Sequence, residues 1–203
     1  PEILTTLVRT RLPKAYGVNP IKDIQILCPM NRGSAGARTL NEVLQLALNP
    51  PTEASVLKFG TKFSVGDKVM QIENNYDRDV FNGDIGFVTR LDAEEEELTV
   101  DFDGREVVYP YGELDELVLC YATTIHKSQG SEYPIVVLPI TMQHYVMLKR
   151  NLIYTGVTRG KMLVILVGQK KALAMAVRGK QTIARNTGLR HWLQNENPTQ
   201  NEF

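Results

Sequence analysis

The chain has 203 residues, of which 43% are hydrophobic and 23% are charged. This length predicts one large domain or two small ones, and the composition excludes a disordered chain, a collagen-like repeat and a disulfide scaffold. The 23 basic residues balance the 23 acidic ones, and a net charge of zero, taken over the whole chain, argues against a nucleic-acid partner.

The first 53 residues predict one strand followed by one helix. Residues 24–28 (IQILC) form a short β-prone run that Pro29 closes. Apolar residues then recur at the i, i+3, i+4, i+7 and i+8 spacing of an amphipathic helix over residues 40–48, which Asn49-Pro50-Pro51 ends. This block carries six basic and four acidic residues.

Residues 54–118 differ from the first block in pattern and in charge. Short strands are expected at 69–73, 86–89, 98–102 and 106–109, and the Asp103-Gly104 turn favours a tight hairpin between the last two. This density of short strands predicts a small antiparallel barrel. The block has 16 acidic but only six basic residues, and its four consecutive acids at 94–97 are expected at a solvated hairpin tip.

The last block, residues 119–203, returns to an α/β pattern. β-prone runs that suit buried parallel strands lie at 117–123, 135–139 and 163–167, and helices are expected over 143–155 and 170–177. The polar tail at 195–203 is expected to be frayed. Because buried parallel strands need covering helices, we expect residues 1–53 and 119–203 to form one α/β domain, into which residues 54–118 are inserted.

The charge of the last block changes the meaning of the zero net charge. Residues 119–203 contain 11 basic but only three acidic residues. The zero is therefore a cancellation between an acidic middle and two basic flanks, and it carries no argument against nucleic acid. Charge asymmetry of this kind suggests separate modules with separate partners.

The cysteines, the histidines, the apolar runs and the first residue of the chain narrow the class of protein further. Cys28 and Cys120 are single and far apart, so they are expected to be small core residues of a cytoplasmic protein. The three histidines lack metal-ligand spacing, which predicts no metal site. No apolar run reaches the roughly 18 residues of a membrane helix, so no membrane partner is expected. The chain does not begin with methionine, which indicates a piece of a longer protein.

One segment, residues 121–132 (YATTIHKSQGSE), leads from a β-prone run directly into hydroxyls, a cation, an amide and a glycine. Such groups at the carboxyl end of a strand suit contact with phosphate, and a helix starting there would add free N–H groups. Gly130 would allow a close approach of the backbone. The alternative is a helix capped by Thr124 or Ser128 without any ligand.

A second segment, residues 151–161 (NLIYTGVTRGK), carries Arg159 just before the apolar run at 163–167. A guanidinium in that place could reach the charge of a phosphoryl group. The alternative is a surface arginine that interacts with a helix C-terminus.

Taken together, these two segments resemble the fifth and sixth motifs of superfamily 1 helicases, in particular the second motor domain of the RecD-like group, which translocates 5′ to 3′. The opening of that domain is similar to residues 27–33, 40–41 and 48–50, and its SH3-like insert is similar to residues 66–71, 74–76 and 80–86. The resemblance implies a RecA-like α/β fold, a parallel sheet with helices on both faces, interrupted by a small antiparallel SH3-like β-barrel.

The resemblance also assigns roles to residues. Arg159 would be catalytic, as an arginine finger that stabilises charge on the transferring phosphoryl group. The residues implied to face ATP are Gly130, Gln129 and Glu132. Those implied to face single-stranded DNA are Thr123, Thr124, His126, Lys127, Ser128, Asn31, Arg32 and Tyr76. Tyr76 belongs to the acidic insert, where Asn74, Asn75 and Asn82 either guide the strand with it or are simply turn residues.

A P-loop, G-x-x-x-x-G-K-[S/T], does not occur in the sequence. Residues 33–39 (GSAGART) come nearest, with the wrong spacing and an arginine in place of the lysine. We therefore expect ATP and Mg²⁺ to be bound jointly with a preceding N-terminal motor domain, and the isolated chain to be inactive. The expected partners are that domain, single-stranded DNA and other recombination or repair subunits. The alternative is a non-catalytic nucleic-acid-binding module derived from a helicase fold.

Overall fold

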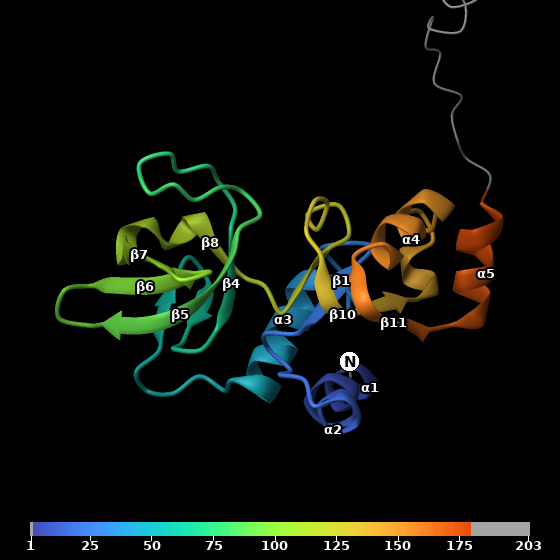
Figure 1. Cartoon of the computed structure of the whole chain (residues 1–203), viewed down its shortest axis with the longest axis horizontal. Coiled ribbons are helices and arrows are strands. Elements are labelled where there is room, and N and C mark those ends of the chain that lie inside the picture. Colours follow the sequence, from blue (N-terminus) through green and yellow to red (C-terminus); the bar gives the residue numbers. More distant parts are fainter. Residues whose placement is uncertain (1, 180–203) are drawn as a thin grey trace, which may run out of the picture.

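The computed structural model describes residues 2–179 and contains an α/β unit and a β unit, which lie side by side (Figure 1). The chain begins in the α/β unit, leaves it after its first strand and the helix that follows that strand, builds the β unit and then returns. The α/β unit begins with α1 (Glu2–Thr6), a π-helical turn (Leu7–Arg11), α2 (Leu12–Tyr16), β1 (Ile24–Cys28) and α3 (Ala37–Leu48). It continues with β9 (Ala122–Thr124), β10 (Tyr133–Ile140), a 3-10 turn (Met142–His144), α4 (Arg150–Val157), β11 (Gly160–Gly168) and α5 (Lys170–Arg178).

The four strands of the α/β unit form one parallel sheet in the order β11-β10-β1-β9. Alternate residues of the central strands enter two separate cores. Ile24 and Ile26 of β1 pack on the side of α1, α2 and α3, whereas Leu27 packs with residues of α4 and α5. Helices therefore cover both faces, and the predicted parallel architecture is confirmed.

The β unit is antiparallel, as predicted. A five-stranded sheet has the order β7-β6-β5-β4-β8, and a separate hairpin pairs β2 with β3. These strands and one 3-10 turn are β2 (Val56–Lys58), β3 (Thr61–Phe63), β4 (Lys68–Gln71), β5 (Ile85–Asp92), β6 (Glu97–Phe102), β7 (Arg105–Pro110), η2 (Tyr111–Glu116) and β8 (Leu117–Leu119). Asp103 and Gly104 turn the chain with φ of 54° and 89° between β6 and β7. The acidic run lies at the β5–β6 tip, where Asp92 pairs with Glu97.

The single strand expected over 117–123 is wrong, because the run divides between the two sheets. Residues 117–119 pair with β4 of the β unit, and residues 122–124 pair with β1 of the α/β unit. Side-chain amides satisfy the carbonyls at the crossing: Asn41 Nδ2 donates to Leu119 O (2.8 Å) and Ala122 O (2.9 Å). Gln25 Nε2 donates to Cys120 O at 3.2 Å. These contacts replace strand partners and allow the chain to bend.

The helix expected over 143–155 is wrong in its first half. The chain turns after the 3-10 segment, where His144 O accepts hydrogen bonds from the N–H groups of both Met147 and Leu148. An α-helix starts only at Arg150. Tyr145 and Val146 are 64% and 61% exposed, so the apolar residues of this stretch do not all mark a buried helical face. The helix expected over 170–177 is confirmed as α5.

The two cysteines are core residues, as expected. Both are buried and free, and burial raises the pKa of the Cys28 thiol to about 12 and that of Cys120 to about 11. No helix within residues 2–179 is long and apolar enough to cross a membrane. The tail predicted to be frayed, 195–203, lies outside the described residues.

Candidate nucleic-acid groove and phosphate-facing arginine

A groove of about 720 Å³ lies between the α/β unit and the β2–β3 hairpin. One wall is built from the ends of β1 and β9, which are adjacent parallel strands, so their carboxyl ends meet at one edge of the sheet. Four of the residues predicted to bind DNA line this wall: Asn31, Thr124 and Lys127 are accessible, whereas Thr123 is only 5% exposed. Arg38 of α3 adds a second cation, and it forms a 3.9 Å ion pair with the exposed Glu42.

The segment after β9 is a turn, and no helix starts there. Thr124 Oγ1 accepts a hydrogen bond from the N–H of Lys127 at 3.3 Å, which holds the lysine beside the strand end. The α3 N-terminus is not a free anion site either. The N–H groups of Ala37 and Arg38 donate to the carbonyls of Met30 and Asn31. Phosphate in the groove would therefore meet side chains, not a helix N-terminus.

The remaining predicted DNA-facing residues do not line this groove. Ser128 is fully buried, and its hydroxyl donates to Ile125 O at 2.8 Å, so it holds the turn together. His126 lines a smaller depression of about 200 Å³ with Gln129 and residues of α4. Arg32 is exposed in the loop after β1. Tyr76 is 77% exposed on the β4–β5 loop and meets Phe81 edge-on.

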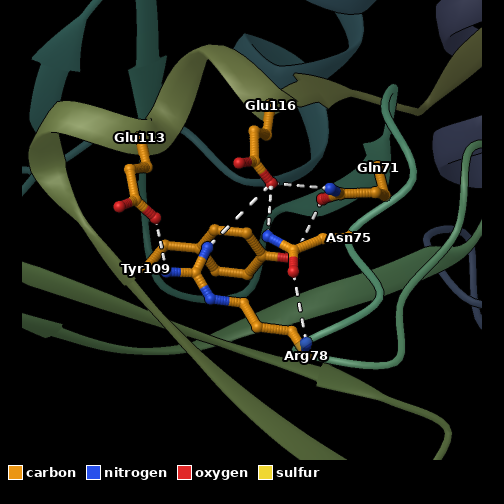
Figure 2. A network of polar contacts seen from close by, with 6 residues as sticks. All are labelled: Gln71, Asn75, Arg78, Tyr109, Glu113 and Glu116. Atoms are coloured by element: carbon orange, nitrogen blue, oxygen red, sulfur yellow. Dashed lines mark hydrogen bonds and ion pairs between the residues drawn. The ribbon is translucent and has the colours of Figure 1, made fainter.

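A polar network fastens the β4–β5 loop that carries Tyr76 (Figure 2). Glu116 accepts from Gln71 at 2.8 Å and from Asn75 at 3.4 Å, and Asn75 Oδ1 accepts from the N–H of Arg78. The Arg78 guanidinium binds Glu113 and lies 4.9 Å from the Tyr109 ring centroid. Asn74 Oδ1 also accepts from the N–H of Asn82. Asn74 and Asn75 thus stabilise the turns of this loop, and a role of the asparagines in guiding the strand stays a prediction.

A buried carboxylate joins the β unit to the α/β unit behind the groove. Asp67 is fully buried and accepts four hydrogen bonds, two on each oxygen. The donors are Gln45 Nε2 (2.6 Å) and Ser64 N (2.8 Å) on Oδ2, and Asn49 Nδ2 (2.7 Å) and Tyr121 OH (2.7 Å) on Oδ1. Burial raises the pKa of the Asp67 carboxyl, and the four donors oppose that rise. The contacts link α3, the crossing at residue 121 and the β unit.

The residue that follows Asp67 in the sequence, Lys68 of β4, is a buried lysine. Lys68 Nζ approaches Ile24 O of β1 at 3.5 Å and lies 5.9 Å from the Tyr133 ring centroid of β10. Burial lowers the pKa of Lys68 to about 8. The apolar core is also continuous across the junction, because residues of β1, α3, β4 and β6 belong to one cluster. The β unit is therefore held firmly in one orientation.

Arg159 lies where the strands of the parallel sheet begin, at the end opposite to the carboxyl ends that form the groove wall. Its carbonyl accepts from the N–H of Tyr133 at 2.8 Å, at the amino end of β10. The strand registers place Cys28 and Thr124, at the groove, level with Pro139 of β10. Pro139 lies six residues after Tyr133, which marks the position of Arg159. At about 3.3 Å per residue, the groove and Arg159 are roughly 20 Å apart along the strands. The segment 125–132 runs from one to the other.

The Arg159 side chain contacts neutral acceptors. Its guanidinium donates to Ser131 O (3.2 Å), Thr155 O (3.3 Å) and Thr158 Oγ1 (3.3 Å). Within residues 2–179 no carboxylate forms an ion pair with it, so its positive charge is uncompensated there. This environment fits an anionic group such as a phosphate.

The other residues predicted to face ATP lie beside this arginine. Gly130 turns the chain with φ of 88°, and the space where a Cβ would stand is open. Glu132 forms an exposed 3.6 Å ion pair with Lys161. Gln129 lies in the smaller depression together with Thr155, whose carbonyl Arg159 contacts. The described residues contain no cluster of three or more His, Cys, Asp or Glu side chains that could hold a metal ion.

The fold, a parallel α/β unit interrupted by an antiparallel β unit, is that of the second RecA-like motor domain of a superfamily 1 helicase with an SH3-like insert. Two family models match in that order: the ATP-dependent RecD-like DNA helicase SH3 domain over residues 40–102 and the UvrD-like helicase C-terminal domain over residues 119–167. The chain belongs to the RecD-like helicases.

Individual relatives agree with this assignment. The chain is 41% identical over 166 residues to the ATP-dependent RecD2 DNA helicase of Deinococcus radiodurans, which covers 82% of the chain and 23% of that protein. It is 30% identical over 176 residues to the RecBCD enzyme subunit RecD of Haemophilus influenzae, covering 86% of the chain and 26% of the relative. The chain thus spans about a quarter of the length of these relatives.

Solved structures support the fold. A Bacteroides Pif1 helicase crystallised with ADP-AlF3 and single-stranded DNA has a TM-score of 0.59 at 17% identity, over 95% of this chain and 48% of that one. A structure of Pif1 helicases unwinding forked DNA has a TM-score of 0.54 at 20% identity, over 84% of this chain and 43% of that one. The predicted RecA-like fold is confirmed.

Proposed function

We propose that this chain is the C-terminal motor region of an ATP-dependent 5′–3′ DNA helicase. The observation that carries the proposal is the groove, where the ends of two parallel strands and one hairpin enclose Asn31, Thr124 and Lys127. The chain binds single-stranded DNA there and supplies Arg159 to an ATP site completed by an N-terminal P-loop domain. Both the polarity and the association with other recombination or repair subunits are proposed from the RecD-like relatives.

DNA contact in the groove is made mainly through phosphates. Lys127 neutralises one phosphate, and the amide of Asn31 and the hydroxyls of Thr123 and Thr124 donate to phosphate oxygens. Contacts of this kind position a strand without reading its sequence. The arrangement therefore suits a motor that moves along any sequence.

The segment 125–132 couples the two sites. One end lies at the DNA groove beside Lys127, and the other supplies the Ser131 carbonyl that Arg159 contacts. A shift of this segment on binding or loss of the ATP γ-phosphate would be transmitted to the strand end at Thr124. Hydrolysis and movement along DNA are joined in this way.

Single-stranded DNA binding by the chain is expected to depend steeply on salt, with a slope of log K against log[salt] of about −0.7 per neutralised phosphate. Lys127→Ala should make this slope shallower by about 0.7, because one phosphate contact is lost. The measurement is fluorescence anisotropy with labelled oligo-dT over a salt series. Lys14→Ala, which removes an exposed cation of α2, is the matched control and should leave the slope unchanged. An unchanged slope for Lys127→Ala would exclude this wall as the DNA site.

Polarity is tested by strand displacement with the gene product that contains this region and a P-loop domain. We expect unwinding of a duplex with a 5′ single-stranded tail and none of a duplex with a 3′ tail. Unwinding only from the 3′ tail would contradict the proposed polarity. DNA binding without ATP hydrolysis or unwinding would instead favour the non-catalytic module.

A further inference from the structure

Two hairpins of the β unit use the same turn with different residues. Asp103-Gly104 joins β6 to β7 with φ of 54° and 89°, and Phe59-Gly60 joins β2 to β3 with φ of 47° and 75°. Two-residue hairpin turns with positive φ at both positions strongly favour Asn, Asp or Gly at the first. A bulky aromatic residue there is an outlier. The conformation of the turn therefore does not explain why residue 59 is a phenylalanine.

The Phe59 ring does not contribute to the core. It is 61% exposed, and Leu57, two residues earlier on the same face of the hairpin, is 67% exposed, whereas Phe63 is fully buried. Both exposed side chains line the groove between the two units. Large apolar groups gathered on a groove wall mark a binding surface.

The hairpin is fixed in place, although its tip is exposed. Gln45 Nε2 of α3 donates to Lys62 O at 2.7 Å, and Lys58 Nζ lies 5.5 Å from the Tyr111 ring centroid. Ser55 and Ser64, which flank the hairpin, are joined by a hydrogen bond of 2.9 Å. The aromatic tip is thus held at a set position in the groove wall.

Charge identifies the occupant of the groove. Residues 54–66, which contain the hairpin, have two lysines and no acidic residue, whereas residues 67–118 have 16 acidic and four basic residues. The insert thus carries no acidic residue in the segment that faces the groove. The opposite wall carries Lys127 and Arg38, together with one acid, Glu42, which forms an ion pair with Arg38. A groove with cations, one exposed aromatic ring and an exposed leucine suits a strand that offers both phosphates and flat bases.

We propose that Phe59 stacks on a base of the single strand bound in the groove, while Lys127 on the other wall neutralises its phosphate. This inference rests on the proposed function, in which the groove holds single-stranded DNA. Leu57 supports the base from the same face of the hairpin. Stacking of this kind tolerates every sequence, because each base has a π-face.

The test compares Phe59→Asn with the wild-type chain on oligo-dT and on an abasic strand of the same length. Asn-Gly is a preferred pair for this turn, so the variant keeps the hairpin, and its melting temperature should not fall. We expect its affinity for oligo-dT to decrease about 5- to 100-fold with an unchanged salt slope. Its affinity for the abasic strand should equal that of the wild type. Phe59→Trp should retain binding to oligo-dT.

Two controls separate this inference from the groove proposal. Tyr16→Ala, which removes another exposed aromatic side chain, should bind both strands like the wild type. One outcome would overturn stacking by Phe59 and leave the groove as the DNA site. In that outcome Lys127→Ala makes the salt slope shallower, but Phe59→Asn still distinguishes oligo-dT from the abasic strand as the wild type does. If neither variant changes binding, the groove itself is wrong. An equal loss on both strands would also overturn stacking.

Discussion

Replacing Arg159 by alanine is expected to lower the kcat of ATP hydrolysis by about 10³- to 10⁵-fold in a protein that contains this region and a P-loop domain. The guanidinium has only neutral partners among the described residues, Ser131 O, Thr155 O and Thr158 Oγ1. Its charge is therefore available to the transition state. The rate is measured with saturating single-stranded DNA in a coupled phosphate-release assay.

Further variants separate an arginine finger from a structural arginine. Arg159→Lys keeps the charge but loses the planar fork, so we expect a rate between those of wild type and alanine. Arg150→Ala removes an exposed cation from the first turn of α4, the helix that ends just before Arg159, and should change the rate less than twofold. The affinity of Arg159→Ala for oligo-dT should stay at the wild-type level, because the groove lies at the opposite edge of the sheet. A rate within tenfold of wild type for Arg159→Ala would contradict the finger.

Replacing Asp67 by alanine is expected to lower the free energy of unfolding by about 3 to 5 kcal/mol. The carboxylate accepts from Gln45, Asn49, Ser64 and Tyr121, and each buried donor left without an acceptor costs about 1 to 3 kcal/mol. Rearrangement of the side chains recovers part of that loss. The measurement is urea unfolding followed by circular dichroism at a fixed pH.

Two further variants test whether the loss of stability is specific to the Asp67 carboxylate. Asp67→Asn keeps the shape but turns one acceptor into a donor that faces other donors, so it should also destabilise the protein. Asp77→Ala removes an exposed carboxylate of the β4–β5 loop and should change the unfolding free energy by no more than about 0.5 kcal/mol. A loss below about 1 kcal/mol for Asp67→Ala would show that the network does not hold the two units together.

The elements that could be predicted are those whose signal is local. The apolar runs at 24–28 and 135–139 are strands because residues buried on both faces of a parallel sheet are continuously apolar. The run at 163–167 is also a strand, but the burial expected for it is wrong, because β11 lies at the edge of the sheet and Leu166 is 41% exposed. The Asp103-Gly104 turn is correct because these two residues tolerate positive φ. Hairpin β2–β3 was not predicted, since its strands have only three residues each and Phe59 is an unusual turn residue.

Candidate site residues could be named from the sequence, but their grouping could not. Ser128 lies among polar residues and resembles a ligand-binding serine, yet it is buried because its hydroxyl serves the Ile125 carbonyl. His126 and Lys127 are neighbours in sequence but line different hollows. Adjacent residues in a turn point in different directions, and only the path of the turn decides which side chain meets which surface.

The sequence by itself determined the α/β class, the antiparallel insert, the segregated charge and the helicase-like motifs, because composition, periodicity and turn chemistry act over a few residues. The tertiary structure alone decided where the chain crosses between the sheets, since Asn41 and Gln25 bind carbonyls about 80 to 95 residues away. It alone placed Phe59 opposite Lys127 and Arg159 at the far edge of the sheet. Contacts between distant segments depend on strand order and register, which no local pattern encodes.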